Sequence, residues 1–503
     1  MGKRAEQAKK RKRQNNGKPV AVVVAEPLTP AESTDSLLLP EEIEAAILVM
    51  RTLAENPELL ADKEMKDVKR GVYDLHKVLV EGATLGSSLT SRITAALKDY
   101  RFTDALVLLF EMYTRRMPPK LGALQRWVRE CDATSGADGS PGDPEALRCL
   151  DMILRIANMG EAGNADLPGE SSDARDHVRK VRVWRARTRG EDHPDEVAIW
   201  DRMQNKTLFG PAGTEAQKPY PGFRVANFVR GADRRPPNVY DSTVWTSEPG
   251  TIRLTPAASR RAPTKVPVPG VPGAFQVLDV FTPDECLQII QAASAHGFER
   301  DQAAEGSALM KTSILARNFL WLADTHFLDH FYSQIVPFVP ASAPVHGGVG
   351  GGKVRGINGR FRVYEYTENQ LYRPHIDGAW PAAGLHPETG EYMHDSQPAD
   401  DPLWSRYTLL VYLNSDIPED TGCTTFFLPS NEMGVMDATS VRPIQGSVLC
   451  FPHGDTQGSL LHEGSAVGAN GGKLVIRTDL LYEARGFGQF KPATAGATQA
   501  SQD

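Results

Sequence analysis

The chain has 503 residues, which is longer than one ordinary domain, so we expect more than one folded part. Hydrophobic residues make up 41% of it, enough for buried cores, and the formal net charge of −7 argues against a chain that coats nucleic acid through bulk charge. The five cysteines are odd in number and not closely paired, and no apolar run is long enough to span a membrane, which favours a reduced, intracellular protein of the nucleus or cytoplasm.

The chain starts with a polar, basic segment, residues 1–36, which we expect to be disordered. Its run Lys-Lys-Arg-Lys-Arg at residues 9–13 is typical of a nuclear localisation signal or of a tail that binds nucleic acid. A solvated tail with neither role is the alternative, so nucleic acid stays an open partner. Residues 486–503 are expected to form a second disordered tail.

Residues 37–160 are predicted to form a helical region. Helices are expected to start at Pro40, which is followed by two acidic residues, and to cover 67–81, 90–100, 103–116 and 120–131. No repeat of fixed period is visible, so an RNA-reading array of helical repeats is not supported. The region is expected to be a small helical bundle that binds another macromolecule or packs on the rest of the chain.

Residues 161–272 are predicted to be a linker and arm with partial structure, because prolines and glycines recur there among arginines. Short strands are expected within it at 223–229 and 251–254. Residues 273–485 differ from it, since short β-rich runs alternate there with Gly, Asp and Pro breaks, as in an antiparallel sandwich or barrel. These runs cover residues 275–281, 362–366, 408–414, 422–429, 446–451 and 473–482.

Three residues in this last part are of the types that bind a metal ion. His375 and Asp377 are two positions apart, so one strand end can direct both side chains the same way, and His462 follows on a later strand. Two imidazoles and one carboxylate can hold one face of an octahedral ferrous ion and leave positions for a bidentate 2-oxo acid and dioxygen. Lys473 and Arg477 follow, and a cation there can hold the far carboxylate of that acid.

With these motifs, the segment resembles the prolyl-4-hydroxylase-type group of iron(II)- and 2-oxoglutarate-dependent dioxygenases. The resemblance covers roughly residues 273–484 and is carried by Arg-Val-Tyr-Glu-Tyr from Arg362, Tyr-Arg-Pro-His-Ile-Asp-Gly from Tyr372, and His-Glu-Gly-Ser-Ala-Val from His462. It implies an α+β multidomain chain in which a helical N-terminal region precedes a double-stranded β-helix, or jelly roll, at 273–485. The metal ligands implied are His375, Asp377 and His462.

The resemblance also implies residues that contact 2-oxoglutarate. Family members carry a basic residue about ten positions after the distal histidine; Lys473 is the favoured counterpart, and Arg477 is the rival, with an ion pair inside the barrel as its other interpretation. Tyr366 and Tyr412 match tyrosines that line the cosubstrate pocket, and Tyr372 is a weaker candidate of the same kind. The histidines at 346, 394 and 453 are predicted to be surface or loop residues.

The function implied is that of a dioxygenase that uses Fe(II) and 2-oxoglutarate, with ascorbate as a candidate addition, to hydroxylate a C–H bond in a protein or peptide, with prolyl side chains as one option. A scaffold that senses metal or 2-oxoglutarate, a small-molecule oxygenase and a nucleic-acid demethylase are the alternatives. A pull-down of a partner that survives His375→Ala would favour the scaffold.

Overall fold

The computed structural model describes residues 40–62, 65–81, 88–134, 142–157, 177–187, 196–234, 237–301, 316–343, 352–455 and 457–484. The chain forms two compact units, Met1–Gly86 and Ser87–Asp503. The predicted basic run at 9–13 and the predicted tail at 486–503 lie outside the described residues. Among the described residues, no helix has the length and apolar character that crossing a membrane requires.

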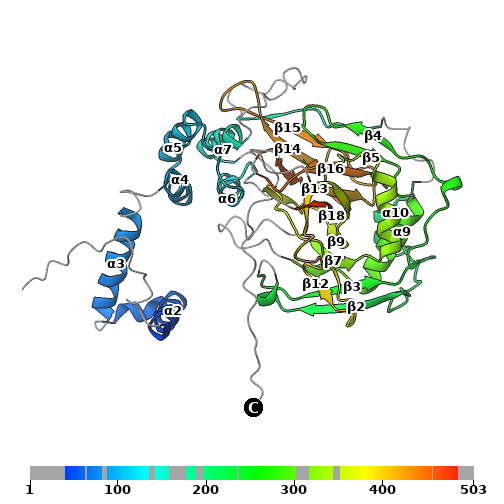
Figure 1. Cartoon of the computed structure of the whole chain (residues 1–503), viewed down its shortest axis with the longest axis horizontal. Helices are drawn as coiled ribbons and strands as arrows, with labels where there is room; N and C mark the ends of the chain where they lie inside the picture. The colour runs from blue at the N-terminus through cyan, green and yellow to red at the C-terminus, as the bar shows by residue number, and fades with distance from the viewer. Residues whose placement is uncertain are drawn as a thin grey trace, which may run out of the picture. The chain divides into compact units, whose positions relative to one another are not determined.

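The first unit contains helices α2 (Pro40–Glu55) and α3 (Lys66–Glu81), with the 3-10 turn η2 (Pro57–Ala61) between their sequences (Figure 1). Two acidic residues in the first turn of α2 favour its start, because carboxylates are stabilised near helix N-termini. Many of the described apolar side chains of the two helices, such as Leu48 and Val72, are exposed.

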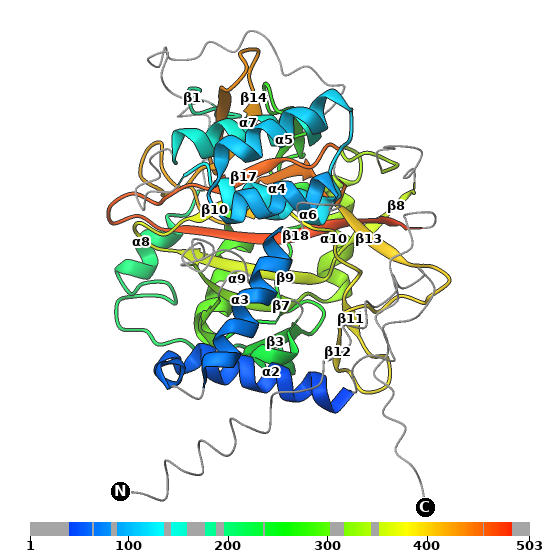
Figure 2. The ribbon, with the colours of Figure 1, turned by 90° about the vertical axis from the view of Figure 1, so that its left-hand side faces the viewer.

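The second unit begins with four helices, α4 (Leu89–Lys98), α5 (Phe102–Thr114), α6 (Leu121–Cys131) and α7 (Pro144–Ala157). Ser88 caps α4 by accepting a hydrogen bond from the backbone N–H of Ser91. The helices share one hydrophobic core, to which the strands beside them contribute Phe427, Met436 and Leu461. Figure 2 shows them in front of β10, β14 and β17. This part of the predicted helical region therefore packs on the β-rich part of the chain.

Two sheets form the centre of the second unit. The five-stranded sheet has the order β1, β15, β14, β17, β10, and the 11-stranded sheet has the order β2, β3, β7, β9, β18, β13, β16, β5, β4, with β6 paired to β7 and β8 to β18. The bounds in the small sheet are β1 Val178–Lys180, β15 Met436–Val441, β14 Thr424–Pro429, β17 Leu461–Gly464 and β10 Tyr372–His375. Those in the large sheet are β2 Phe223–Val229, β3 Ser242–Ser247, β4 Thr264–Pro267, β5 Phe275–Leu278, β6 Glu299–Arg300, β7 Arg317–Leu322, β8 Val354–Ile357, β9 Arg360–Tyr366, β13 Leu403–Tyr412, β16 Val448–Pro452 and β18 Lys473–Glu483.

The strands from β9 onward pass repeatedly between the two sheets. In chain order β9 lies in the large sheet, β10 in the small, β13 in the large, β14 and β15 in the small, β16 in the large, β17 in the small and β18 in the large. The short hairpin β11 (Gly384–Leu385) and β12 (Tyr392–Met393) interrupts this series. Phe426 and Phe451 join the two sheets by an edge-on ring contact with centroids 5.1 Å apart.

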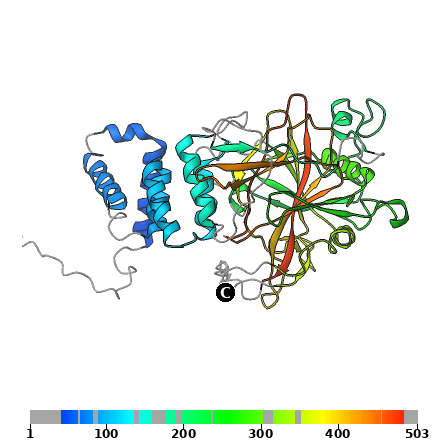
Figure 3. The same cartoon turned by 90° about the horizontal axis from the view of Figure 1, so that it is seen from above.

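Helices α9 (Pro283–His296) and α10 (Thr325–Ile335) cover the other face of the large sheet (Figure 1). Thr282 and Glu285 form the capping box that starts α9, as the sequence predicted. In the view from above, the sheets lie between the cyan helical part and these green helices (Figure 3). The layers of the second unit are thus helices, small sheet, large sheet and helices.

Side-chain alternation gives the two faces of the large sheet different characters. On β9, Phe361 and Val363 join the core under α9 and α10, so Arg362, Tyr364 and Tyr366 point toward the small sheet. The same alternation on β18 places Lys473, Val475, Arg477 and Asp479 on this inner face. Charged side chains between two packed sheets are costly as plain core, so this space is the natural place to look for a site.

The structure agrees with the predicted α+β character, since helices precede extensive β-sheet. The predicted strand at 223–229 is β2, whereas residues 251–254 are described and form no strand. Strands β3 and β4 also come from the predicted linker 161–272 and join the large sheet, and α8 (Ile199–Gln204) lies in the same segment. The predicted helical region 37–160 is divided between the two compact units.

Candidate metal and cosubstrate site

His375, Asp377 and His462 converge at one end of the small sheet. His375 ends β10, Asp377 follows it by two residues, and His462 lies in β17 directly opposite His375 in the antiparallel pairing. One potential ligand atom from each residue lies within 4.8 Å of the others. Asp377 approaches the two Nε2 atoms at 3.6 Å (His375) and 3.7 Å (His462). A single ion placed among these atoms would have three protein ligands on one side.

The two histidines are held in the tautomer that a metal requires. His375 Nδ1 is 2.8 Å from the carbonyl oxygen of Arg373, and His462 Nδ1 is 3.0 Å from that of Leu460. A carbonyl only accepts, so each Nδ1 carries the hydrogen and each Nε2 keeps its lone pair. Burial, followed by the charge of His462, lowers the pKa of His375 to about 3, and burial also lowers that of His462. Both imidazoles are therefore neutral near pH 7.

Asp377 is held as an ionised carboxylate. Burial by itself would raise its pKa, but the net shift is downward, and the charge of Arg477 is the largest of the effects that oppose burial. Arg477 Nη2 is 3.3 Å from Asp377 Oδ1 and 3.3 Å from Asp479 Oδ1. Arg477 thus stands beside the proposed metal ligand, which corresponds to the ion-pair interpretation of this residue.

A chain of buried hydrogen bonds leads from Asp377 to the loop that follows it. The Thr408 hydroxyl donates to Asp377 Oδ2 at 2.7 Å and therefore accepts from His453 Nδ1–H at 2.7 Å. His453 Nε2 then accepts from the Ser405 hydroxyl at 2.7 Å, and Ser405 accepts from the backbone N–H of Trp380 at 2.8 Å. Every donor in this chain has an acceptor, so it fixes the orientation of the carboxylate.

His453 was predicted to be a surface or loop residue; it lies in the loop after β16 but is not on the surface. The side chain is 4% exposed, because it follows β16 into the space between the sheets and is held there by Ser405 and Thr408. Both partners are on β13, 45 and 48 residues away in sequence, so the sequence near His453 gave no signal of it. His346 lies outside the described residues, and His394 is a partly exposed loop residue, in line with its prediction.

Lys473 has the surroundings of a carboxylate-binding cation. Its Nζ lies 5.6 Å from the ring centroid of Tyr366 and 5.8 Å from that of Tyr412. This ammonium donates a hydrogen bond to the Cys423 carbonyl at 3.5 Å, and no carboxylate among the described residues pairs with the ammonium. Burial lowers the pKa of Lys473 to about 8. A buried ammonium without an anionic partner fits the far carboxylate of a 2-oxo acid.

The three candidate tyrosines differ in how they face the site. Tyr412 donates its hydroxyl to Thr424 at 2.8 Å, so it offers the pocket its ring, while Tyr366 is buried beside Lys473. Tyr372, the weakest candidate from the sequence, stacks on the His375 imidazole with centroids 3.8 Å apart. Its position therefore supports the orientation of a proposed ligand.

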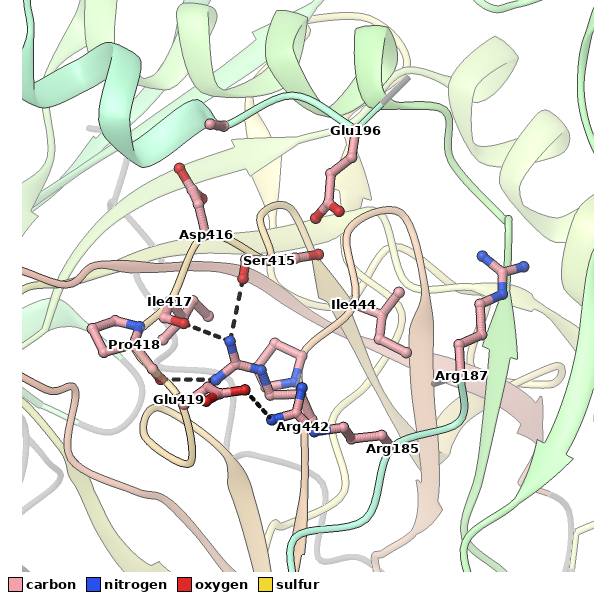
Figure 4. A pocket seen from close by; sticks show the side chains of 12 residues that line it. Arg185, Arg187, Glu196, Ser415, Asp416, Ile417, Pro418, Glu419, Arg442 and Ile444 are labelled. Carbon is pink, nitrogen blue, oxygen red and sulfur yellow. Dashed lines mark hydrogen bonds and ion pairs between the residues drawn. The ribbon is translucent and has the colours of Figure 1, made fainter. Parts of the chain in front are cut away.

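A cavity of about 510 Å³ elsewhere on the second unit has a different character (Figure 4). It is lined by Arg185, Arg442, Glu419 and neighbouring residues, and none of the proposed ligands lines it. The Arg442 guanidinium donates to backbone carbonyls of the 415–421 loop, including those of Ile417 and Pro418, and Arg185 pairs with Glu419. These arginines stabilise the loop that leads to Cys423, the neighbour of Lys473, and do not form a second metal site.

Helix α6 and the loop after it contact the strand that carries the ligands. Gln125 donates to the carbonyl of Ile376 at 3.1 Å, and Ile376 lies between the proposed ligands His375 and Asp377. Asp132 forms a buried ion pair with Arg373 at 2.5 Å, and the Thr134 hydroxyl donates to Glu463, the neighbour of His462, at 2.8 Å. The sequence did not predict these contacts, which span hundreds of residues and leave no local pattern.

No family model and no curated protein sequence matches the chain. Similar solved structures include the viral collagen prolyl hydroxylase from Paramecium Bursaria Chlorella virus-1 in its 2OG complex (16% identity, 45% of this chain, 99% of that chain, TM-score 0.26). Another is a Pseudomonas putida prolyl-4-hydroxylase (14% identity, 42% of this chain, 92% of that chain, TM-score 0.25). A third is a Trichoplax adhaerens prolyl hydroxylase in complex with a hypoxia inducible factor peptide (16% identity, 40% of this chain, 76% of that chain, TM-score 0.25). Similarity at these TM-scores carries no functional argument, so the argument rests on the site itself.

Proposed function

We propose that the chain is an Fe(II)- and 2-oxoglutarate-dependent dioxygenase that hydroxylates a C–H bond. The observation that carries the proposal is the set of donors at the site: two Nε2 lone pairs and one carboxylate converge within 4.8 Å. This set suits a ferrous ion that keeps positions open for a 2-oxo acid and dioxygen. The buried, unpaired ammonium of Lys473 supplies the second requirement, a cation for the far carboxylate.

We assign the strands that carry these residues to a double-stranded β-helix. The passage of β9, β10 and β13 to β18 between two packed sheets supports this assignment, because jelly rolls are wound in this way. In such a fold the ligands come from the small sheet and Lys473 from the large sheet, which places the two binding functions on facing walls.

The protein's own residues would bind and orient the reactants. His375, Asp377 and His462 hold the metal, which when bound with 2-oxoglutarate supplies the oxidising chemistry. Lys473 orients the cosubstrate by its distal end, and the Tyr366 and Tyr412 rings keep water from that ammonium. We further propose a protein or peptide substrate, prolyl residues included, and ascorbate as an addition that sustains activity.

Anaerobic binding tests the proposal before any substrate is known. Purified protein with Fe(II) and 2-oxoglutarate should show a metal-to-ligand charge-transfer band, and Asp377→Ala should remove it because one of three ligands is lost. Asp395→Ala is the matched control, since this exposed carboxylate has only a local turn contact with the Gln397 backbone. No band in wild type after reconstitution would refute the proposal and favour a scaffold that uses this domain without chemistry.

Substrate class is tested next. Peptide pools from lysate should stimulate conversion of 2-oxoglutarate to succinate, and mass spectrometry should locate a gain of one oxygen atom. Stimulation by small metabolites alone, with no peptide oxidised, would replace the peptide proposal by a small-molecule oxygenase.

A further inference from the structure

Helix α6 directs one stripe of side chains at the strand that carries His375. Gln125 and Arg129 are four residues apart, so they lie on the same side of the helix, and Asp132 directly follows the helix end at Cys131. Gln125 contacts the carbonyl of Ile376, and Asp132 contacts the side chain of Arg373. Arg129 lies between these two anchors and is therefore level with the end of β10 that carries the ligands.

Arg129 has an unusual position for a helix arginine. Its Nε is buried and has no hydrogen-bond partner among the described residues, and no described carboxylate forms an ion pair with its guanidinium. Burial raises the pKa of Tyr372 and lowers that of His375, and the nearby charge of Arg129 lowers both. The guanidinium is thus close to the metal site and is left with an unused donor.

The facing wall adds positive charge rather than neutralising it. Arg477 and Arg362 are opposite each other on β18 and β9. Arg362 has Asp301 at 3.2 Å, but Asp301 also pairs with Arg234 at 2.8 Å. Arg477 pairs with Asp377, which the metal would also use, and with Asp479 at 3.3 Å.

Arg360, further along the same face of β9, has a buried Nε with no hydrogen-bond partner among the described residues, although its charge reaches Asp479. Its guanidinium lies over the Trp380 ring at 4.9 Å. The surroundings of the metal site therefore contain more guanidinium groups than carboxylates free to pair with them, and 2-oxoglutarate already has Lys473 and the metal as its partners.

We propose that Arg129 is a substrate-binding residue and that the substrate is an acidic peptide, whose carboxylate accepts hydrogen bonds from this guanidinium. A planar carboxylate suits one guanidinium, which offers two parallel donors. The carboxylate comes from a glutamate or aspartate side chain or from a peptide C-terminus, and the test separates these sources. This inference rests on the proposed function and specifies its substrate.

Three small probes test it on the anaerobic Fe(II) protein saturated with 2-oxoglutarate. Acetyl-Glu-amide carries a side-chain carboxylate, acetyl-Gln with a free C-terminus carries a terminal one, and acetyl-Gln-amide carries neither. Each is titrated while the charge-transfer band is recorded. We expect a saturable shift from one or both carboxylate probes and none from the neutral probe.

Variants on the same helix identify the residue responsible. Loss of a charge-assisted hydrogen bond should make Arg129→Gln bind the active probe about tenfold more weakly or worse. Arg126→Gln, a change at an exposed arginine of α6, should behave as wild type, and the affinity for 2-oxoglutarate should be the same in all three proteins.

Several results would overturn the inference while the proposed function stands. The first is a band that no carboxylate probe shifts. The second is a probe that binds Arg129→Gln as tightly as wild type, which would place the probe on the metal alone. The third is a weaker affinity of Arg129→Gln for 2-oxoglutarate, which would make Arg129 a cosubstrate residue. If wild type forms no band at all, the proposed function fails and this inference fails with it.

Discussion

Replacing Thr408 by valine would remove the hydroxyl that joins Asp377 to His453 and leave the side-chain shape almost unchanged. Both hydrogen bonds are 2.7 Å long and both partners are buried. Loss of a hydrogen-bond partner of a metal ligand weakens metal binding by about 10- to 100-fold, so we expect that range for Fe(II). The stranded His453 Nδ1–H should also lower the free energy of unfolding by about 1–3 kcal/mol, the cost of a buried donor without an acceptor.

Anaerobic metal titration gives the dissociation constant, and urea unfolding of the metal-free protein gives the stability. Thr408→Ser keeps the hydroxyl and should retain most of both quantities. Thr439→Val is the matched control, because the buried Thr439 hydroxyl has no hydrogen-bond partner among the described residues and its removal should cost nothing. If Thr408→Val binds Fe(II) as tightly as wild type, the hydrogen-bond chain does not orient Asp377 and our reasoning is wrong.

Four other changes have expected outcomes. Lys473→Met should weaken 2-oxoglutarate binding about tenfold or more in calorimetry. If the variant binds 2-oxoglutarate as tightly as wild type, Arg477 would be the residue that holds the far carboxylate. Because burial lowers the pKa of Lys473 to about 8, its charge is present below that pH and lost above it, so affinity should fall as pH rises past about 8 in wild type and not in Lys473→Arg. Arg373→Met breaks the buried pair with Asp132 and should lower the free energy of unfolding by about 3–5 kcal/mol; a loss no larger than that of Arg101→Met, in an exposed pair, would contradict this. Fe(II) at about 100 times its dissociation constant should raise the free energy of unfolding by about 2.7 kcal/mol in urea titrations, and Asp377→Ala should show no such gain.

Local patterns in the sequence were enough for much of the fold. The capping box at Thr282 marked the start of α9, and β-rich runs marked β9, β13, β14, β16 and β18, because caps and alternation depend on residues a few positions apart. The spacing of His375 and Asp377, together with the β-rich runs around them, singled out this pair, since residues two apart on a strand share a side. Their role as ligands stays a proposal, as does that of His462.

Other features depend on contacts that no local pattern records. Strands β3 and β4 lie in a proline-rich segment, and their pairing in the large sheet comes from partners far along the chain. Lys473 and Arg477 share one face of β18, so the sequence could not separate them. In the structure Arg477 pairs with Asp377, whereas no carboxylate of the described segments pairs with Lys473. Arg129 and His453 reach the site from α6 and from the end of β16, and only folding brings them there.

The proposed ligands of the candidate centre differ in how far substitutions of neighbouring residues can change their orientation. Each imidazole is oriented by the carbonyl two residues before it in the chain, and a backbone carbonyl is present whatever residue stands there. The carboxylate, in contrast, is oriented by the side chains of Thr408 and Arg477. Natural or engineered substitutions around the centre would therefore change the orientation of the carboxylate, while the orientation of the two histidines would stay the same.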